Sequence, residues 1–232
     1  MKNYIFLLLM VPAWVSAQNR QVVETVAGED LSQKVSAQMQ YLFPEFINGD
    51  VFYKGLPKGR GKLNYNMLAG EMQFVENDQV MALANVKDVV LVNINNRKFY
   101  PYSGNEFVEE LMSTGTIQLA VRRKGNAASH SKKGAYGMET STSAITSYSS
   151  INSANQQYNL TVTENVLISL TNYYYLVGTN GKYTLIKNKK TFANKFPNYN
   201  AQIDIFVKEH NTKFNNEEDL KALLDYCSKL NN

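Results

Sequence analysis

The chain has 232 residues and a formal net charge of +4, from 24 Lys and Arg against 20 Asp and Glu. Cys227 is the only cysteine, so no disulfide can form within the chain, and small disulfide-scaffold folds are excluded. The mild positive charge is not concentrated in the stripe that a nucleic-acid-binding module needs, so we expect no nucleic-acid partner.

The N-terminus predicts export. Lys2 precedes a short apolar stretch, residues 5–15, and Ala17 ends a small-x-small signal peptidase site. We therefore expect a signal peptide at residues 1–17, cleavage after Ala17, and a mature protein in the periplasm, at the cell surface or outside the cell. A retained N-terminal anchor is the alternative, but the stretch is shorter than the ~20 residues of a membrane helix. No later run is long and apolar enough, so we expect no membrane span after signal removal.

The region from residue 18 to residue 40 is polar and leaves two interpretations open, a strand at 22–25 or a short helix after Asp30. From residue 41, apolar and polar residues alternate in short runs, which is typical of half-buried antiparallel strands. We expect such strands at residues 41–43, 51–54, 63–66, 71–75, 79–83, 89–94 and 97–100. Turn residues predict turns at 48–50, 55–59, 76–78 and 95–96.

The second half of the chain continues this pattern. Residues 106–112 fit either a helix or a strand, whereas residues 116–123 alternate as a strand does. Residues 125–157 are rich in Ser, Thr, Asn and Gly and predict a long mobile loop. Beyond it, the pair Asn180-Gly181 predicts a hairpin between strands at 166–177 and 182–186.

The C-terminal segment changes to a helical period. Short helical turns are expected around Phe192 and Phe196, and an amphipathic helix over residues 201–210. The clearest helix follows Asn216, a suitable N-cap, and carries acidic residues in its first turn. Its apolar face is formed by Leu220, Leu223, Leu224, Cys227 and Leu230.

These elements predict a mainly β protein with a small C-terminal α-helical cap. The strands would form an antiparallel meander, either a rolled sheet or a sandwich. By count of elements the fold is α+β. The expected division is a signal peptide at 1–17, a β domain at 18–187 that includes the loop at about 125–157, and a helical cap at 188–232 packed on the β domain.

No combination of residues predicts catalysis. Cys227 lies on the apolar face of the last helix, where a thiol packs as a small apolar group. His130 and His210 are far apart and show no metal-ligand spacing. The adjacent acids Glu109-Glu110 and Glu217-Glu218 point away from one another if they are helical, so they do not make a glycosidase pair. We expect no catalytic residue, no metal site and no cofactor.

Two surface features remain as candidate binding sites. Lys54, Lys58, Arg60 and Lys62 surround one predicted turn and form a possible surface for an anionic ligand; the alternative is a charged edge that keeps the hairpins soluble. The aromatic residues 173–175 form either a stacking platform for sugars or ordinary cross-strand packing.

Several short motifs resemble a known group of proteins. They are the turn GDV at 49–51, LNYN at 63–66, GEMQF at 70–74, and a C-terminal region with FP at 196–197 and EEDL at 217–220. The chain resembles a widespread group of secreted, β-rich, uncharacterised proteins of Bacteroidota, over most of its mature length except the Ser/Asn-rich loop. The resemblance implies an exported β-rich fold and brings no catalytic residues.

The sequence therefore predicts an exported, non-catalytic protein that binds or scaffolds a component of the cell envelope, either a protein or a glycan. The binding surface would be a face of the sheet or the long loop at 125–157, since polar loops on rigid scaffolds often bind ligands. A hydrolase acting on envelope glycans is the alternative function, and an outer-membrane barrel, which would need repeated lipid-facing strands, is a further one.

Overall fold

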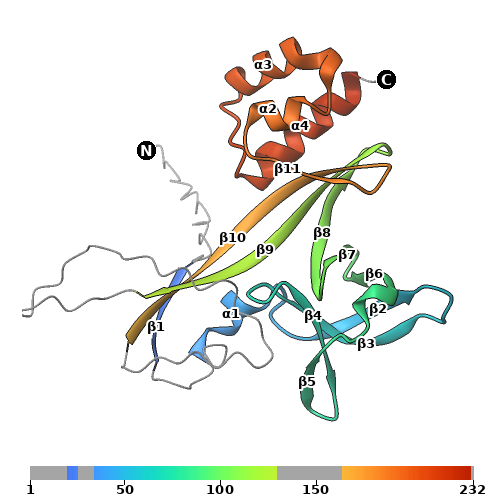
Figure 1. Cartoon of the computed structure of the whole chain (residues 1–232), viewed down its shortest axis with the longest axis vertical. Coiled ribbons are helices and arrows are strands. Elements are labelled where there is room, and N and C mark those ends of the chain that lie inside the picture. Colours follow the sequence, from blue (N-terminus) through green and yellow to red (C-terminus); the bar gives the residue numbers. More distant parts are fainter. Residues whose placement is uncertain (1–19, 26–33, 130–163, 231–232) are drawn as a thin grey trace, which may run out of the picture.

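The computed structural model describes residues 20–25, 34–129 and 164–230. The expected signal peptide at 1–17 and its cleavage site after Ala17 lie outside these residues. The protein is mainly β, with a closed core of six antiparallel strands and a small set of C-terminal helices (Figure 1). This confirms the predicted fold class and shows that the sheet rolls up into a barrel. No helix in the described ranges is long and apolar enough to cross a membrane.

The barrel is a meander in which most strands pair with their neighbours in the chain. Its strands are β2 (Ile47–Tyr53), β3 (Gly59–Asn66), β4 (Glu71–Glu76), β6 (Val89–Ile94), β7 (Arg97–Ser103) and β8 (Glu106–Ser113). The order β8-β7-β6-β2-β3-β4 closes where Glu71 pairs with Glu106, and the Phe107 N–H donates to the Gly70 carbonyl at 2.7 Å. The short strand β5 (Gln79–Ala82) extends the sheet beyond β4.

Large apolar side chains fill the barrel interior. Tyr65, Met72, Phe99 and Phe107 are each fully buried there, and the rings of Tyr65 and Phe99 lie 5.3 Å apart. The Tyr65 hydroxyl donates to the Phe107 carbonyl at 3.1 Å, which satisfies the one polar group that this ring carries into the core. These side chains thus form a packed core inside the barrel.

A long hairpin projects from the barrel. It consists of β9 (Ile117–Ser129) and β10 (Glu164–Gly178), which pair from Gly178↔Ile117 to Val166↔Ser129. Two further strands pair with β10: β1 (Arg20–Thr25) and β11 (Tyr183–Leu185), which follows the Asn180-Gly181 turn. Of the two interpretations left open for residues 18–40, the structure shows a strand at β1 and also a one-turn helix, α1 (Ala37–Gln40). Gly181 has φ +71°, a conformation that glycine adopts without strain.

The helical cap covers one face of this hairpin (Figure 1). It contains α2 (Lys189–Ala193), α3 (Asn200–Glu209) and α4 (Glu217–Leu230), with a 3₁₀ turn η3 (Pro197–Tyr199) between the first two. The Asp219 N–H donates to the Asn216 side chain at 3.0 Å, so Asn216 caps α4 as predicted. The predicted apolar face of α4 packs on Leu119, Val121 and Leu176 of the hairpin.

Three local expectations are wrong or need new limits, and one open alternative is resolved. Residues 48–50 lie inside β2 and do not form a turn, because Gly49 fits where the barrel leaves no room for a side chain. Residues 41–43 follow the one-turn helix α1 (Ala37–Gln40) and form only a bridge, Tyr41↔Asn66, since Pro44 prevents a longer strand.

The third concerns the end of a strand, and the open alternative concerns residues 106–112. β9 continues to Ser129, so the long loop begins later than residue 125, because residues 125–129 pair with β10. The rest of that expected loop, 130–157, lies outside the described residues. Residues 106–112, whose pattern fitted a helix or a strand, belong to β8.

Candidate functional site

The two faces of the β9–β10 hairpin differ in chemistry. Side chains alternate along a strand, so the aromatic block 173–175 divides between them. Tyr174 packs under the helical cap with the residues of α2 and α4, whereas Tyr173 and Tyr175 pack on the opposite face. The expected single platform of three tyrosines is therefore two surfaces, and we describe each in turn.

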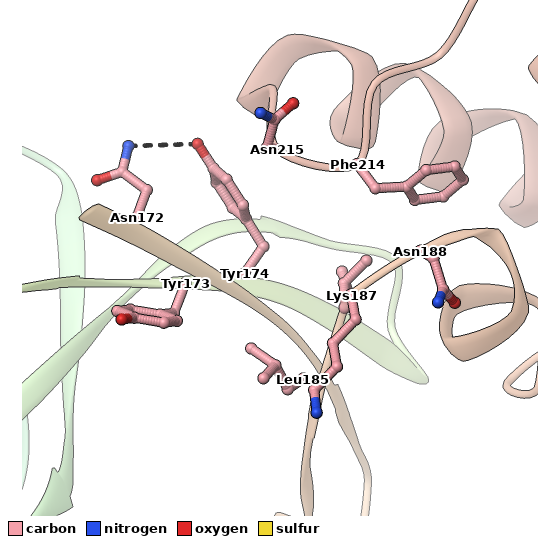
Figure 2. A pocket seen from close by; sticks show the side chains of 9 residues that line it. Asn172, Tyr173, Tyr174, Leu185, Lys187, Asn188, Phe214 and Asn215 are labelled. Carbon is pink, nitrogen blue, oxygen red and sulfur yellow. Dashed lines mark hydrogen bonds between the residues drawn. The ribbon is translucent and has the colours of Figure 1, made fainter.

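On the cap side, a pocket of about 640 Å³ lies between β10, the chain after β11 and the segment before α4 (Figure 2). Its walls combine aromatic rings, aliphatic groups and side-chain amides, from Asn172, Tyr173, Tyr174, Leu185, Ile186, Lys187, Asn188, Phe214 and Asn215. Among the residues that the structure describes, no Asp, Glu, His or Cys lines it. The size is within the range of small-molecule sites in proteins.

The hydrogen bonds around this pocket fix some of its groups and leave others available. The Asn172 amide donates to the Tyr174 hydroxyl at 3.3 Å, as Figure 2 shows, and burial raises the pKa of Tyr174. The Asn188 side chain accepts the Thr191 N–H at 3.0 Å and thereby caps α2. Asn172 and Asn215 are exposed at the rim. Amides both donate and accept hydrogen bonds, and Lys187 adds a positive charge, so this rim suits a polar ligand.

On the opposite face, tyrosines from three strands, β7, β10 and β11, gather around one arginine of β9. The rings of Tyr102 and Tyr183 lie 5.1 Å apart, and those of Tyr102 and Tyr175 lie 5.5 Å apart. The Arg122 guanidinium lies 5.3 Å from the Tyr102 ring centroid and 5.8 Å from that of Tyr173. Arg122 also pairs with Glu106 at 2.6 Å. We call Tyr102, Tyr173, Tyr175, Tyr183 and Arg122 the tyrosine face.

Burial governs the protonation of these tyrosines. It raises the pKa of Tyr175 to about 12, with a smaller effect from the hydrogen bond to Tyr102. Nearby Tyr100 also has its pKa raised to about 12 by burial, with a contribution from the Glu110 carboxylate. Both phenols are therefore neutral at physiological pH. A smaller hollow of about 260 Å³ lies at one end of this face, between Tyr100 and Tyr183.

The structure places the four predicted anion-binding cations around Asp50 and the neighbouring turn. Lys58 and Arg60 pair with Asp50 at 3.1 and 3.0 Å, and these bonds, led by the one from Arg60, lower the pKa of the Asp50 carboxyl. The Lys54 ammonium donates to the Lys87 carbonyl at 2.9 Å. Lys62 lies on the same strand as Arg60. Asp50 offsets part of the positive charge, and anion binding at this surface stays a prediction.

The adjacent acids serve structural contacts. Glu109 is buried and pairs with Arg97 and Arg123, while Glu110 pairs with Lys98 at 3.3 Å and accepts from the Tyr100 hydroxyl at 3.2 Å. The two carboxylates thus engage different partners and do not face each other across a cleft. On α4, Glu217 accepts from Lys221 at 2.7 Å and Glu218 is exposed.

The remaining single residues behave as the sequence predicts where the structure describes them. Cys227 is buried, and burial raises the pKa of its thiol to about 12. His210 ends α3 and stacks on Phe206 with ring centroids 4.0 Å apart. His130 lies outside the described residues. In the described ranges, no group of three or more His, Cys, Asp and Glu side chains could hold a metal ion.

Sequence reasoning missed the pocket because its walls are distant in the chain. Asn172, Asn188 and Asn215 come from β10, the start of α2 and the segment before α4. No local spacing links them, and each amide taken alone predicts a turn or a cap. Tyr173 and Tyr174 are the wall residues that the sequence singled out.

No known protein family, no curated protein and no solved structure matches the chain. The resemblance to the secreted β-rich proteins of Bacteroidota therefore stays a prediction from the motifs at 49–51, 63–66 and 70–74.

Proposed function

We propose that this chain is an exported, non-catalytic protein of the cell envelope, and that the pocket beside β10 holds the envelope component that it binds. The observation that carries the proposal is the composition of the pocket walls. They offer aromatic rings for stacking and amides for hydrogen bonding, and they include no carboxylate, imidazole or thiol. Such walls suit recognition, which needs shape and polar contacts, more than hydrolysis, which needs positioned acids and bases.

The hydrolase alternative has less support. Glycoside hydrolysis uses two carboxyl groups facing each other across the scissile bond. The buried carboxylate Glu109 is held between Arg97 and Arg123, and Glu106 is held by Arg122. The oxygens of both carboxylates are thus already engaged in ion pairs within the fold, and neither is placed as one of a facing pair.

A pocket-filling variant tests the proposal. Asn215 is exposed, so Asn215→Trp adds a large ring at the rim without removing a buried contact. We expect wild-type protein to co-sediment with isolated cell envelopes and Asn215→Trp to lose most of this binding. Ile205→Trp is the matched control, because Ile205 is an exposed residue of α3 that does not line the pocket.

Thermal unfolding of the three proteins should give similar midpoints, which would show that lost binding is not lost folding. Equal co-sedimentation of wild type and Asn215→Trp would reject the pocket as the binding site. Incubation with purified envelope glycans tests the alternative. If new reducing ends appear at a rate proportional to the protein concentration, the protein is a hydrolase and the proposal of a non-catalytic function is rejected.

A further inference from the structure

The strand β10 has one edge that is only partly paired. Its partner β9 runs along one side from Val166 to Gly178. On the other side, β1 pairs with residues 164–169 and β11 with residues 175–177. Between these two partners, residues 170–174 have no strand beside them in the described part of the chain. We call residues 170–174 the open edge.

The direction of the backbone groups at the open edge follows from one hydrogen bond. The Ile186 N–H donates to the Tyr174 carbonyl at 2.8 Å, so the backbone groups of Tyr174 point away from β9. Because these groups alternate along a strand, the N–H and C=O of Asn172 also point to the open edge, and those of Tyr173 point to β9. A second hydrogen bond agrees with this alternation. The Gly125 N–H donates to the Leu68 carbonyl, so the backbone groups of Gly125 point away from β10. Gly125 is opposite Leu170, whose own backbone groups therefore point away from β9, to the open edge.

The pocket lies directly beside these backbone groups. Asn172, Tyr173 and Tyr174 of the open edge line it, and so do Leu185 and Ile186, which end the β11 side of the gap (Figure 2). A strand placed in the gap would alternate its side chains between the cap-side pocket and the opposite face, where Tyr173 lies over Arg122. Main-chain pairing and a side-chain pocket therefore occur at one place, as in proteins that bind peptides by strand addition.

We propose that the ligand of the pocket is an extended polypeptide segment that pairs with β10 at the open edge. This inference rests on the proposed binding function and names its partner class. The Tyr174 carbonyl already accepts the Ile186 N–H, so the gap admits a segment of about four residues, roughly 14 Å long. Its side chain above Tyr174 is apolar or aromatic, because the rings of Tyr174 and Phe214 and the aliphatic group of Ile186 lie on this side of the hairpin.

The protein-side test uses proline at the open edge. Asn172→Pro removes one N–H that points to the gap and no hydrogen bond to β9, so the variant should fold. Selection of a phage-displayed random heptapeptide library on the mature wild-type protein should enrich peptides with a large apolar residue near their centre. Synthetic copies should bind Asn172→Pro at least about tenfold more weakly by fluorescence polarisation.

The matched control is Tyr173→Pro, one residue further along the same strand. Its N–H points to β9, so we expect this variant to lower the midpoint of thermal unfolding well below that of Asn172→Pro. A lower unfolding midpoint for Asn172→Pro than for Tyr173→Pro would show that the N–H of Asn172, and not that of Tyr173, points to β9. That result would overturn the inference.

The peptide-side test is a scan with N-methyl groups. Strand pairing predicts that methylation at every second amide of a selected heptapeptide weakens binding at least about tenfold, while methylation at the intervening amides is tolerated. A uniform effect along the peptide, equal binding to wild type and Asn172→Pro, or no enrichment of any peptide would each overturn the inference.

These failures can be separated from failure of the proposed function. If no peptide is selected and Asn215→Trp still loses binding to isolated envelopes, the pocket binds a component that is not an extended peptide. If Asn215→Trp binds envelopes as wild type does, the binding function at this pocket fails as well.

Discussion

At Gly49, the absence of a side chain lets strands β2, β3 and β6 of the barrel pack closely together. A Cβ at this position would lie 2.8 Å from the Asn93 carbonyl oxygen and 2.8 Å from Leu63 Cδ1. We predict that Gly49→Ala lowers the free energy of unfolding by about 1–3 kcal/mol, since the barrel must shift to accept the methyl group. Urea denaturation followed by circular dichroism measures this change.

Its cross-strand partner supplies the control. Gly61 pairs with Gly49, and a Cβ built on Gly61 meets no atom within 4 Å. Gly61→Ala should therefore leave stability unchanged or raise it by up to about 1 kcal/mol, because alanine is the better strand residue. Equal losses in both variants would show that the cost comes from the strand and not from the close approach.

At the level of elements, a buried ion network joins the barrel, the hairpin and the cap. Glu109 of β8 accepts from Arg97 of β7 and Arg123 of β9, and Arg123 lies 3.7 Å from Glu217 of α4. We predict that Glu109→Ala lowers the free energy of unfolding by about 3–5 kcal/mol, because it leaves the buried Arg123 without its main counter-charge. Chemical denaturation measures this loss.

The comparison for this network is a surface pair. Asp225→Ala removes an exposed pair with Lys229 one turn along α4, at 2.6 Å, and should cost no more than about 0.5 kcal/mol. Losses of similar size in the two variants would show that the network contributes no more than an ordinary surface ion pair.

The elements that the sequence predicted well are those fixed by local chemistry. Asn95 and Asn96 adopt positive φ in the tight turn between β6 and β7, as expected, and Asn216 caps α4. The wrong expectation at 48–50 has the opposite origin: an Asn-Gly-Asp run normally makes a turn, and only contacts with Leu63 and Asn93, distant in the sequence, keep it extended.

Non-local pairing also explains an apparent break in alternation. Strict alternation would put Val90 on the same face as Val92 and Ile94, yet Val90 is 45% exposed while Val89 is buried. The register with β2 shifts at this point, so that Tyr53 pairs with Val89 next to the pair Phe52↔Leu91. Such a bulge changes the face of each residue beyond it and depends on the partner strand, which a single sequence does not specify.

The candidate site was the least predictable part. Tyr174 was singled out by its aromatic block, but the pocket also needs Phe214 and Asn215, some forty residues further along, and a gap between β1 and β11. The gap exists only because both strands pair with the same edge of β10. Hydrophobic periodicity predicts strands and says nothing of which edge each strand takes.

For the whole molecule, two tyrosine phenols and one cysteine thiol determine how stability changes at alkaline pH. The pKa of Tyr100 and Tyr175 is about 12 in the folded protein, against an ordinary value of about 10, and the Cys227 thiol is also raised to about 12. Above their ordinary values the unfolded chain releases these protons and the folded chain keeps them. The free energy of unfolding should therefore be fully retained below about pH 9 and fall as the pH rises to 12.

Urea denaturation at half-unit steps from pH 8 to pH 11.5 measures this fall. A triple variant, Tyr100→Phe, Tyr175→Phe and Cys227→Ala, removes the three groups and should show a shallower decline than wild type, whatever its stability at pH 8. Parallel declines in the two proteins would mean that other groups cause the alkaline loss.

The pairing of β1 with β10 has a kinetic consequence. Thr25 and Glu164 are partners although they lie 139 positions apart in the chain. If the chain is threaded through a membrane from its N-terminus, β1 emerges first among the described strands but waits for β10 before it can join the sheet. Contacts between such distant segments slow folding, so β1 would be among the last pieces to dock, and until then it would be open to capture by chaperones or proteases.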